Sequence, residues 1–317
     1  MIKCKNCENE VNQKWKVCPF CGKEIEKELK CENCGFKLEE NWEMCPNCGV
    51  KIGELSKKVE VGNNMVFVKG GTFQMGSNDW PNKSDEQPVH SVTLNDFYID
   101  KYAVTFKEYD EYCEDTGRDE PDSDDWGRRQ RPVIEVSWYD AIRYCNWRSR
   151  KEGLEPCYHL GADTDIEDYD DDDLKDVVCD FTKNGYRLST EAEWEYAARD
   201  GNKSCGYQYA GSNNIDEVAW YEDNSDDKTH PVGAKRANKL SIYDMSGNVC
   251  EWCWDWFGDY SSSSQTNPKG ADSGSERVLR GCGWRYSNAC NGVANRNADD
   301  PADGSYLFGF RLVRSSR

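Results

Sequence analysis

Apolar and polar residues alternate where a long segment begins near Asn63, and this alternation predicts β-strands. The sequence NMVFVKGGTFQMGS at 64–77 places alternating apolar positions on both sides of Gly70 and Gly71. A Gly-Gly pair between two alternating runs is typical of a β-hairpin turn. We therefore expect the segment to open with a hairpin.

Further along the chain, apolar residues follow helical spacing behind residues that cap helix N-termini. Thr105 and Glu108 form a capping box, in which a hydroxyl residue precedes a carboxylate by three positions. The same arrangement recurs at 137–140 and at 190–193, each time before a run with apolar residues on one face. The sequence therefore predicts three helices.

From residue 200 onward the chain is rich in Gly, Asn, Ser, Asp and Trp. This composition predicts short strands between long ordered loops, with aromatic side chains building much of the core. Together with the three helices, it predicts an α+β fold with little regular secondary structure.

The charge of the chain argues against nucleic acid as a partner. The formal net charge is −19, and residues 1–52 contain nine Lys and nine Glu, so the whole excess lies downstream. The acidic run DTDIEDYDDDD at 163–173 is interpreted as a solvated loop, with cation binding through carboxylates as the alternative. No apolar run approaches a membrane span or a secretory leader, so we expect a cytoplasmic protein without a membrane contact.

Cysteine spacing predicts two metal sites near the N-terminus. Four CxxC pairs occur there, and the second two repeat the first two at a shift of 27 residues. Two such pairs supply four thiolates that close tetrahedrally on a structural zinc ion, and a unit this small needs metal to fold. The remaining nine cysteines are expected to be free thiols. The predicted zinc ligands are Cys4, Cys7, Cys18, Cys21, Cys31, Cys34, Cys45 and Cys48.

These patterns divide the chain into a double zinc ribbon at 1–52, a polar linker at 53–62 and a large domain at 63–317. Many zinc ribbons bind nucleic acid. Here the ribbons carry no net charge, and Arg118 is the first arginine of the chain, which favours protein docking or a spacer role instead.

Six motifs in the large domain resemble the formylglycine-generating enzyme family, also called the sulfatase-modifying factor family. The resemblance covers roughly 63–314. It implies a C-type-lectin-like fold in which the C-terminal segment returns to the core and exposes its middle as a ligand face, although fold alone does not give activity. The motifs are MVFVKGGTFQMGS, DEQPVHSVTLNDFYIDKYAVT, RPVIEVSWYDAIRYCNW, NGYRLSTEAEWEYAAR, YDMSGNVCEWCWDW, and RVLRGCGW with GFRLV.

The resemblance implies a copper site that this chain departs from. Enzymes of the family oxidise a substrate cysteine with oxygen, using copper held by two cysteines spaced CxxxxC after a motif that here reads Gly281, Cys282, Gly283. Tyr286 stands where the first copper cysteine would lie, and Cys290 does not restore the spacing. We therefore expect no copper and no catalysis, with a rearranged site of Cys282 and Cys290 as the alternative.

The three histidines of the chain are too few for the non-haem iron used by other relatives, because at least two lie in ordinary structural motifs. In the CEWC sequence, Cys250 and Cys253 are interpreted as packing residues, with redox chemistry as the alternative.

The resemblance also implies a calcium site in the loop around GNxxE. Family members bind calcium there through an Asn or Asp side chain, two backbone carbonyls and a Glu. The matching residues are Asp244, Gly247, Val249 and Glu251. The alternative is that the two carboxylates hold a tight turn by accepting backbone N–H bonds.

The C-terminal segment shows a gap in composition that resembles a codon constraint. The 24 residues from Arg285 to Phe308 include no Lys, Glu, Gln, Met or Trp, although these types make up 73 of the other 293 residues. Randomising both adenines of AAY asparagine codons yields NNY codons, which encode every amino acid except these five. The gap therefore indicates a diversified segment, with an ordinary Gly-, Asn- and Asp-rich loop as the alternative.

Within the family, the chain is most similar to the variable proteins of diversity-generating retroelements, whose randomised positions lie between a Trp, here Trp284, and a terminal GFR, here at 309–311. Val293, Arg296 and Phe310 are expected to hold the scaffold. Tyr and Arg can anchor a ligand, while Ser and Asn adapt to it. The predicted ligand contacts are Arg285, Tyr286, Ser287, Asn288, Cys290, Asn291, Asn297, Ala298, Asp299, Ser305, Tyr306 and Leu307.

Two functions follow as hypotheses. The first is a ligand-binding protein that displays a diversified surface to a protein or other macromolecule on a non-catalytic scaffold. The alternative is a cytoplasmic copper-dependent oxidase acting on a protein cysteine.

Overall fold

The computed structural model describes residues 2–3, 10–11, 64–78, 84–163 and 165–316. The chain divides into two compact units, Met1–Asn63 and Asn64–Arg317. In the first unit, β1 (Ile2–Lys3) pairs antiparallel with β2 (Glu10–Val11). The eight predicted zinc ligands and the linker at 53–62 lie outside the described residues.

The first four strands of the second unit belong to two different sheets, and the chain crosses between these sheets after β3 and again after β5. The strands β3 and β6 pair antiparallel in one three-stranded sheet, and β4 and β5 pair antiparallel in a second. The four strands are β3 (Met65–Val68), β4 (Gly71–Met75), β5 (His90–Leu94) and β6 (Phe97–Asp100).

The expected hairpin at 64–77 is therefore wrong, although both of its strands form. Gly70 marks a close crossing rather than a turn, because a Cβ there would lie 2.3 Å from the carbonyl oxygen of Leu94. Its backbone N–H donates to the Asp96 carboxylate at 2.8 Å. Because it has no side chain, Gly70 lets the segment between β3 and β4 pass close to the Leu94 carbonyl as the chain moves from the first sheet to the second.

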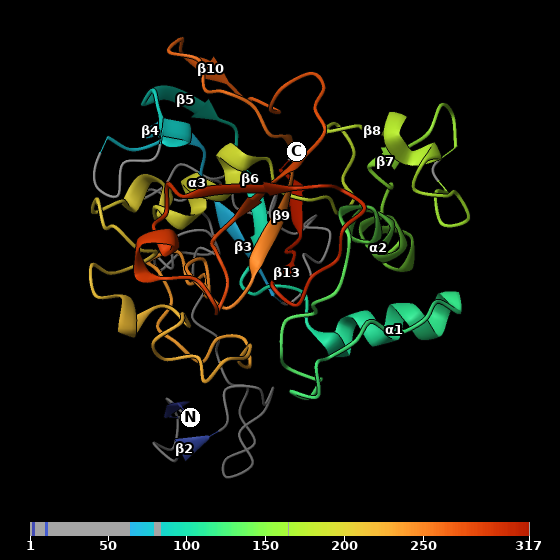
Figure 1. The fold of residues 1–317 in the computed structure, drawn as a ribbon, viewed down its shortest axis with the longest axis horizontal. Coiled ribbons are helices and arrows are strands. Elements are labelled where there is room, and N and C mark those ends of the chain that lie inside the picture. The colour runs from blue at the N-terminus through green and yellow to red at the C-terminus, as the bar shows by residue number, and fades with distance from the viewer. Residues whose placement is uncertain (1, 4–9, 12–63, 79–83, 164, 317) are drawn as a thin grey trace. The chain divides into compact units, whose positions relative to one another are not determined.

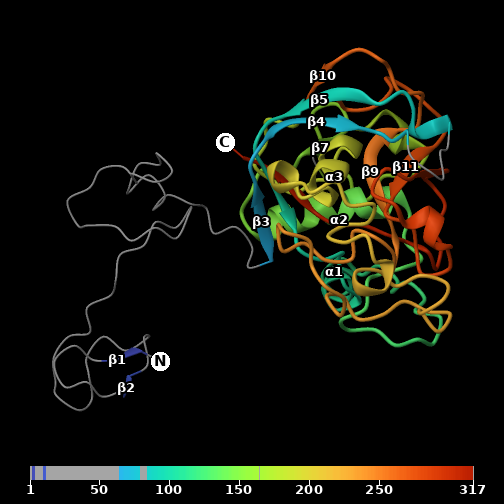
Figure 2. The same ribbon diagram turned by 90° about the vertical axis from the view of Figure 1, so that its left-hand side faces the viewer.

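The C-terminal third of the chain completes these sheets and forms a third. It adds a strand to each of the two sheets, so that their orders are β14-β6-β3 and β10-β5-β4, and builds a four-stranded sheet with the order β12-β11-β9-β13. Figures 1 and 2 show β4, β5 and β10 together at the top of this unit and β9 near its middle. The strands are β9 (Cys250–Trp256), β10 (Gln265–Thr266), β11 (Arg277–Arg280), β12 (Arg296–Asp299), β13 (Phe308–Gly309) and β14 (Val313–Ser315).

All three predicted helices are present, and each begins at its predicted capping box. They are α1 (Phe106–Thr116), α2 (Trp138–Lys151) and α3 (Glu191–Ala198). The Glu108 carboxylate, for example, accepts the backbone N–H of Thr105 at 2.9 Å and its hydroxyl at 2.7 Å. Figure 1 shows α1 and α2 on the right-hand side of the unit.

Short elements account for much of the remaining chain, in agreement with the predicted low content of regular structure. A two-stranded sheet pairs β7 with β8. No helix of the described ranges has the length and apolar character required to cross a bilayer. The short elements are β7 (Tyr158–His159), β8 (Val178–Cys179), η2 (Ser84–Glu86), η3 (Asp173–Asp176), η4 (Gly201–Lys203), η5 (Ile215–Glu217) and η6 (Asn288–Asn291).

Aromatic side chains build much of the core, as predicted. Trp138, Trp194 and Trp252 are among the largest fully buried side chains. Each indole N–H has an acceptor: that of Trp138 donates to the Cys253 carbonyl at 2.9 Å, and that of Trp252 to the Val136 carbonyl at 3.1 Å. These bonds satisfy the polar end of each buried ring.

The acidic run at 163–173 is mostly exposed, and Ile166 is buried beneath it. Arg143, which is buried, donates to the Tyr169 carbonyl and to the Asp171 carboxylate, at 2.7 Å in each case. Because ion pairs and an apolar anchor account for this loop, its structure agrees with a solvated loop tied to α2.

Candidate ligand-binding site

The run from Arg285 to Phe308 forms two loops on either side of an edge strand. After β11, the chain turns through Gly281 and Cys282 with φ of 89° and 52°. A Cβ at Gly281 would lie 2.9 Å from the Trp194 ring, so glycine is required there. The chain then passes through η6 to β12, which pairs with β11 and has no other neighbour among the described strands.

Most of the predicted contact residues reach the surface. Arg285 and Asn288 are exposed, nine others are partly exposed, and Asn291 is buried. Tyr286, Tyr306 and other apolar members pack their inner sides against one core cluster, so the two loops share a base. We call the eleven surface residues of the predicted set the ligand face. They are Arg285, Tyr286, Ser287, Asn288, Cys290, Asn297, Ala298, Asp299, Ser305, Tyr306 and Leu307.

The three residues assigned to the scaffold are buried, as predicted. Val293, Arg296 and Phe310 are 3%, 3% and 0% exposed. Arg296 forms a bidentate pair with Glu191 at the start of α3, with N–O distances of 2.6 and 2.9 Å. Its guanidinium also lies 3.9 Å from the ring centroid of Tyr260. These contacts attach β12 to the core, and Arg296 makes them from within the run 285–308 that lacks five amino-acid types.

Asn291 holds the first loop together rather than facing solvent. Its side-chain amide donates to the Tyr286 carbonyl at 3.3 Å and to the Ser287 carbonyl at 2.8 Å. The side chain is fully buried. It therefore satisfies the backbone beneath the ligand face.

An aromatic cluster supports one end of the ligand face. The rings of Trp126 and Trp284 meet edge to face with centroids 5.2 Å apart, and Tyr306 lies 5.9 Å from Trp284. The Arg285 guanidinium bonds to the Tyr306 hydroxyl and lies 5.8 Å from its ring centroid. Sequence reasoning missed Trp126, because it lies in a polar loop with no periodicity and is brought here only by the fold.

Tyr286 packs among cysteines at the base of the first loop. Burial raises the pKa of the Tyr286 phenol, and the nearby thiols of Cys250, Cys282 and Cys290 raise it further. The hydroxyl is therefore neutral at physiological pH. The Cys282 thiol donates to the Asn295 side chain at 3.0 Å and accepts from the Asn297 amide at 3.1 Å.

The cysteines of the described residues are all free thiols, as predicted. Cys250 and Cys253 are both fully buried, and they belong to different core clusters. Burial raises the pKa of Cys253 well above its usual value. This environment favours the packing interpretation of the CEWC sequence over redox chemistry.

Two family models match this chain. The sulfatase-modifying factor enzyme 1-like domain matches residues 52–316, and the double zinc ribbon matches residues 4–49. The chain belongs to the sulfatase-modifying factor family. Its N-terminal ribbons indicate zinc binding.

Similar proteins within this family carry different names. The chaperone protein LppX of Paenibacillus barcinonensis is 40% identical over 280 residues, covering 82% of this chain and 92% of that protein. The formylglycine-generating enzyme of Thermomonospora curvata is 30% identical over 297 residues, covering 80% and 94%. Among solved structures, Treponema denticola variable protein 1 superposes with a TM-score of 0.69 at 34% identity, covering 80% of this chain and 95% of that one.

The copper site implied by the family does not fit these residues. Tyr286 stands where the resemblance places the first copper cysteine, and the Cys282 thiol is bonded to the side chains of Asn295 and Asn297. We therefore derive no oxidation step through copper.

The histidines occupy three unrelated local environments. A ring nitrogen of His90 bonds to the Pro88 carbonyl at 3.0 Å, and one of His159 bonds to the Gly161 carbonyl at 2.8 Å. His230 stacks on Trp220 with ring centroids 3.8 Å apart. Each histidine is therefore held by a separate local contact.

The calcium ligands implied by the family are close together, but Glu251 does not fit as one. Both of its carboxylate oxygens accept from Arg311, at 2.5 and 2.6 Å, and one also accepts from the Trp194 indole at 2.8 Å. Asp244 accepts the Gly233 N–H at 2.8 Å, as in the turn-holding alternative, while its other oxygen has no partner among the described residues. Burial raises the pKa of Asp244 to about 6. The Glu251 carboxylate is thus the buried counter-charge of Arg311.

Proposed function

We propose that this protein binds a ligand through a diversified C-terminal surface carried on a non-catalytic scaffold of the sulfatase-modifying factor family. The observation that carries the proposal is that exposed and buried positions are separated within the run from Arg285 to Phe308, which lacks five amino-acid types. Eleven of the twelve predicted contacts reach the surface, whereas Val293 and Arg296 in the same run are buried. Variation at the former would leave the buried contacts of Val293 and Arg296 in place.

The similarity to Treponema denticola variable protein 1 supports this proposal. The character of the ligand face favours a protein or another macromolecule as the ligand. Tyr306 and Arg285 offer a rigid aromatic ring and a guanidinium, and the surrounding Ser and Asn side chains can adapt to different shapes. The name of the Paenibacillus relative, a chaperone, is consistent with a protein ligand. The net charge of −19 disfavours nucleic acid.

The remaining parts of the protein receive roles from the same proposal. The two zinc ribbons dock a separate protein, each stabilised by one structural zinc ion bound to the cysteines named above. The many free cysteines, including exposed Cys205, are suited to the reducing cytoplasm.

The test is the DNA flanking the gene. It is searched for a near-copy of the codons for 280–311 that differs at adenines. Such a copy, with AAY codons at positions of the ligand face and unchanged codons at Val293 and Arg296, supports diversification. A flank without any near-copy contradicts diversification and leaves a fixed binding module.

The non-catalytic part of the proposal is tested separately. The purified protein is incubated with copper and a cysteine-containing peptide, and oxygen uptake and copper content are measured beside an active formylglycine-generating enzyme. We expect no uptake above the peptide blank. Copper-dependent uptake that yields a formylglycine product would establish the oxidase instead.

A further inference from the structure

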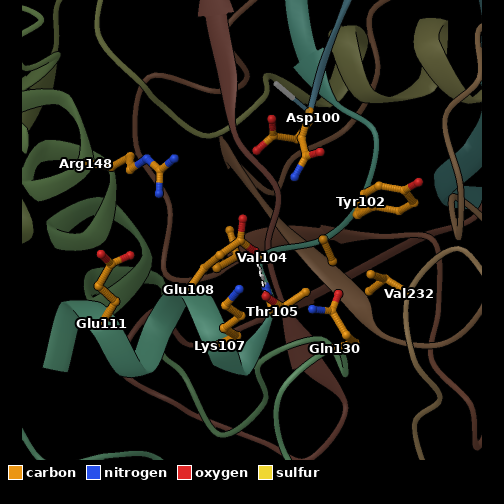
Figure 3. A pocket seen from close by; sticks show the side chains of 12 residues that line it. Asp100, Tyr102, Val104, Thr105, Lys107, Glu108, Glu111, Gln130, Arg148 and Val232 are labelled. Atoms are coloured by element: carbon orange, nitrogen blue, oxygen red, sulfur yellow. Dashed lines mark hydrogen bonds between the residues drawn. The ribbon is translucent and has the colours of Figure 1, made fainter. Parts of the chain in front are cut away.

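A cavity of about 420 Å³ opens beside the first turns of α1, at the end of β6. Figure 3 shows Asp100 from β6, Glu108 from α1 and Arg148 from α2 around it. No residue of the ligand face lines this cavity. Its volume falls in the range of small-molecule sites, about 300 to 1,000 Å³.

Asp100 is held rigidly, yet its carboxyl group has no protein partner in the described structure. The backbone N–H of Asp100 donates to the Leu312 carbonyl at 2.9 Å, and its carbonyl accepts from Arg311 at 3.1 Å. No described residue donates a hydrogen bond to its side chain. The group lines the cavity and is partly accessible, so a ligand in the cavity could reach it.

Three carboxyl groups line the cavity, together with Lys107 and Arg148. Glu108 uses one oxygen for the Thr105 capping bonds, and Glu111 pairs with Lys151 at 2.8 Å. Burial raises the pKa of Asp100 to about 8, and the Glu108 carboxylate adds to this effect. Repulsion between the Asp100 and Glu108 carboxyl groups favours protonation of one of them.

The nearby arginines are already neutralised. Arg148 bonds to Glu152 at 2.6 Å, and Arg311 is engaged by both oxygens of Glu251. Lys107, although it lines the cavity, is exposed and forms no ion pair with a described carboxylate. A cation from outside would complete the charge balance.

We propose that this cavity binds a small organic cation, with its ammonium or guanidinium group between Asp100 and Glu108 and its alkyl part along Val104 and Val232. A metal ion is disfavoured, because no group of three ligating side chains exists in the described part of the chain. The two valines line the cavity and suit a short alkyl chain.

The test is isothermal titration of the full-length protein with cadaverine and with agmatine. The neutral diol 1,5-pentanediol, which matches cadaverine in length, is the control ligand. Asp100→Asn removes the unpartnered carboxyl group at constant shape. Asp115→Asn is the matched control protein, because Asp115 is on α1 and pairs with Lys151 but does not line the cavity.

We expect at least one amine to bind with a Kd below about 1 mM, the scale of a weak but specific small ligand. Asp100→Asn should weaken it at least about tenfold, Asp115→Asn should change it less than about twofold, and the diol should not bind. Val232→Phe, which narrows the cavity and keeps both carboxylates, should also weaken binding. This second variant preserves the test if Asp100→Asn does not fold.

The pH dependence adds an independent readout. Amine affinity should fall about tenfold per pH unit below 8, because the cation requires ionised Asp100, and this slope should vanish in Asp100→Asn. The charged groups around Asp100 are Glu108 and Glu111 of α1, Arg148 and Glu152 of α2, and Arg311. Absence of binding by both amines, or equal affinity of folded Asp100→Asn and wild type, would overturn the proposal.

Discussion

The buried carboxyl group of Asp255 should make the stability of the domain depend on pH. Asp255 lies on β9, is 3% exposed and accepts the backbone N–H of Glu191 at 2.9 Å. Burial raises its pKa to about 8, and the Glu191 carboxylate adds to the shift. The perturbation is Asp255→Asn, which keeps an acceptor for this N–H and cannot ionise.

The sign follows from comparing the folded and unfolded chains. The folded pKa of Asp255 lies above its ordinary value of 3.8, so between about pH 4 and pH 8 the folded group is neutral while the unfolded one is ionised. Wild type therefore loses stability as pH rises through this window, by at most about 1.4 kcal/mol per pH unit. From pH 5 to pH 7 the bound is about 2.7 kcal/mol, and we expect about 1 to 2.5 kcal/mol because Glu191 and Arg296 share the site.

The assay is urea unfolding followed by tryptophan fluorescence at pH 5, 7 and 8. The free energy of unfolding of Asp255→Asn minus that of wild type should increase with pH and level off near 8. Asp259→Asn, at an exposed position on the same segment, is the control and should show no such trend. A difference between Asp255→Asn and wild type that is the same at pH 5 and pH 8 would refute a neutral buried Asp255.

Three further predictions concern a buried side chain of the first loop, a buried ion pair and the zinc ribbons. Asn291→Ala should lower the unfolding free energy by about 1 to 3 kcal/mol, because it removes two hydrogen bonds of a fully buried side chain, whereas exposed Arg285→Ala should change it by less than about 0.5 kcal/mol; equal effects in urea unfolding would contradict the assigned roles. Glu251→Gln should cost about 3 to 5 kcal/mol, because it strips Arg311 of a buried counter-charge, and an unchanged melting temperature would contradict the pairing. Elemental analysis should find two zinc ions per chain, and a chain with Cys4→Ser should retain one.

Local chemistry in the sequence was sufficient to predict the helices. Each capping box joins residues three positions apart, so the pattern and the structure that it specifies lie in the same short segment. The buried positions of Val293 and Arg296 were predicted differently, from the resemblance to a known family. Both kinds of prediction were confirmed by the structure.

The features that sequence reasoning missed depend on contacts between distant segments. Gly70 is a typical turn residue, but its role is set by Leu94 at the end of β5 and by Asp96 between β5 and β6. Trp126 becomes part of the ligand-binding site only because its loop packs against Trp284. No periodicity or spacing along the chain carries that information.

The separation between the ligand face and its supports explains how one segment could vary and still fold. Three buried arginines anchor this region: Arg280 precedes the run 285–308, Arg296 lies within it and Arg311 follows it. Each pairs with a buried carboxylate. Removing one partner of such a pair costs about 3 to 5 kcal/mol, a large part of the stability of a domain. Substitution at exposed loop positions costs little by comparison. The arginine positions must therefore stay constant for the ligand face to change freely, and the order of constant and variable codons along the gene should follow burial.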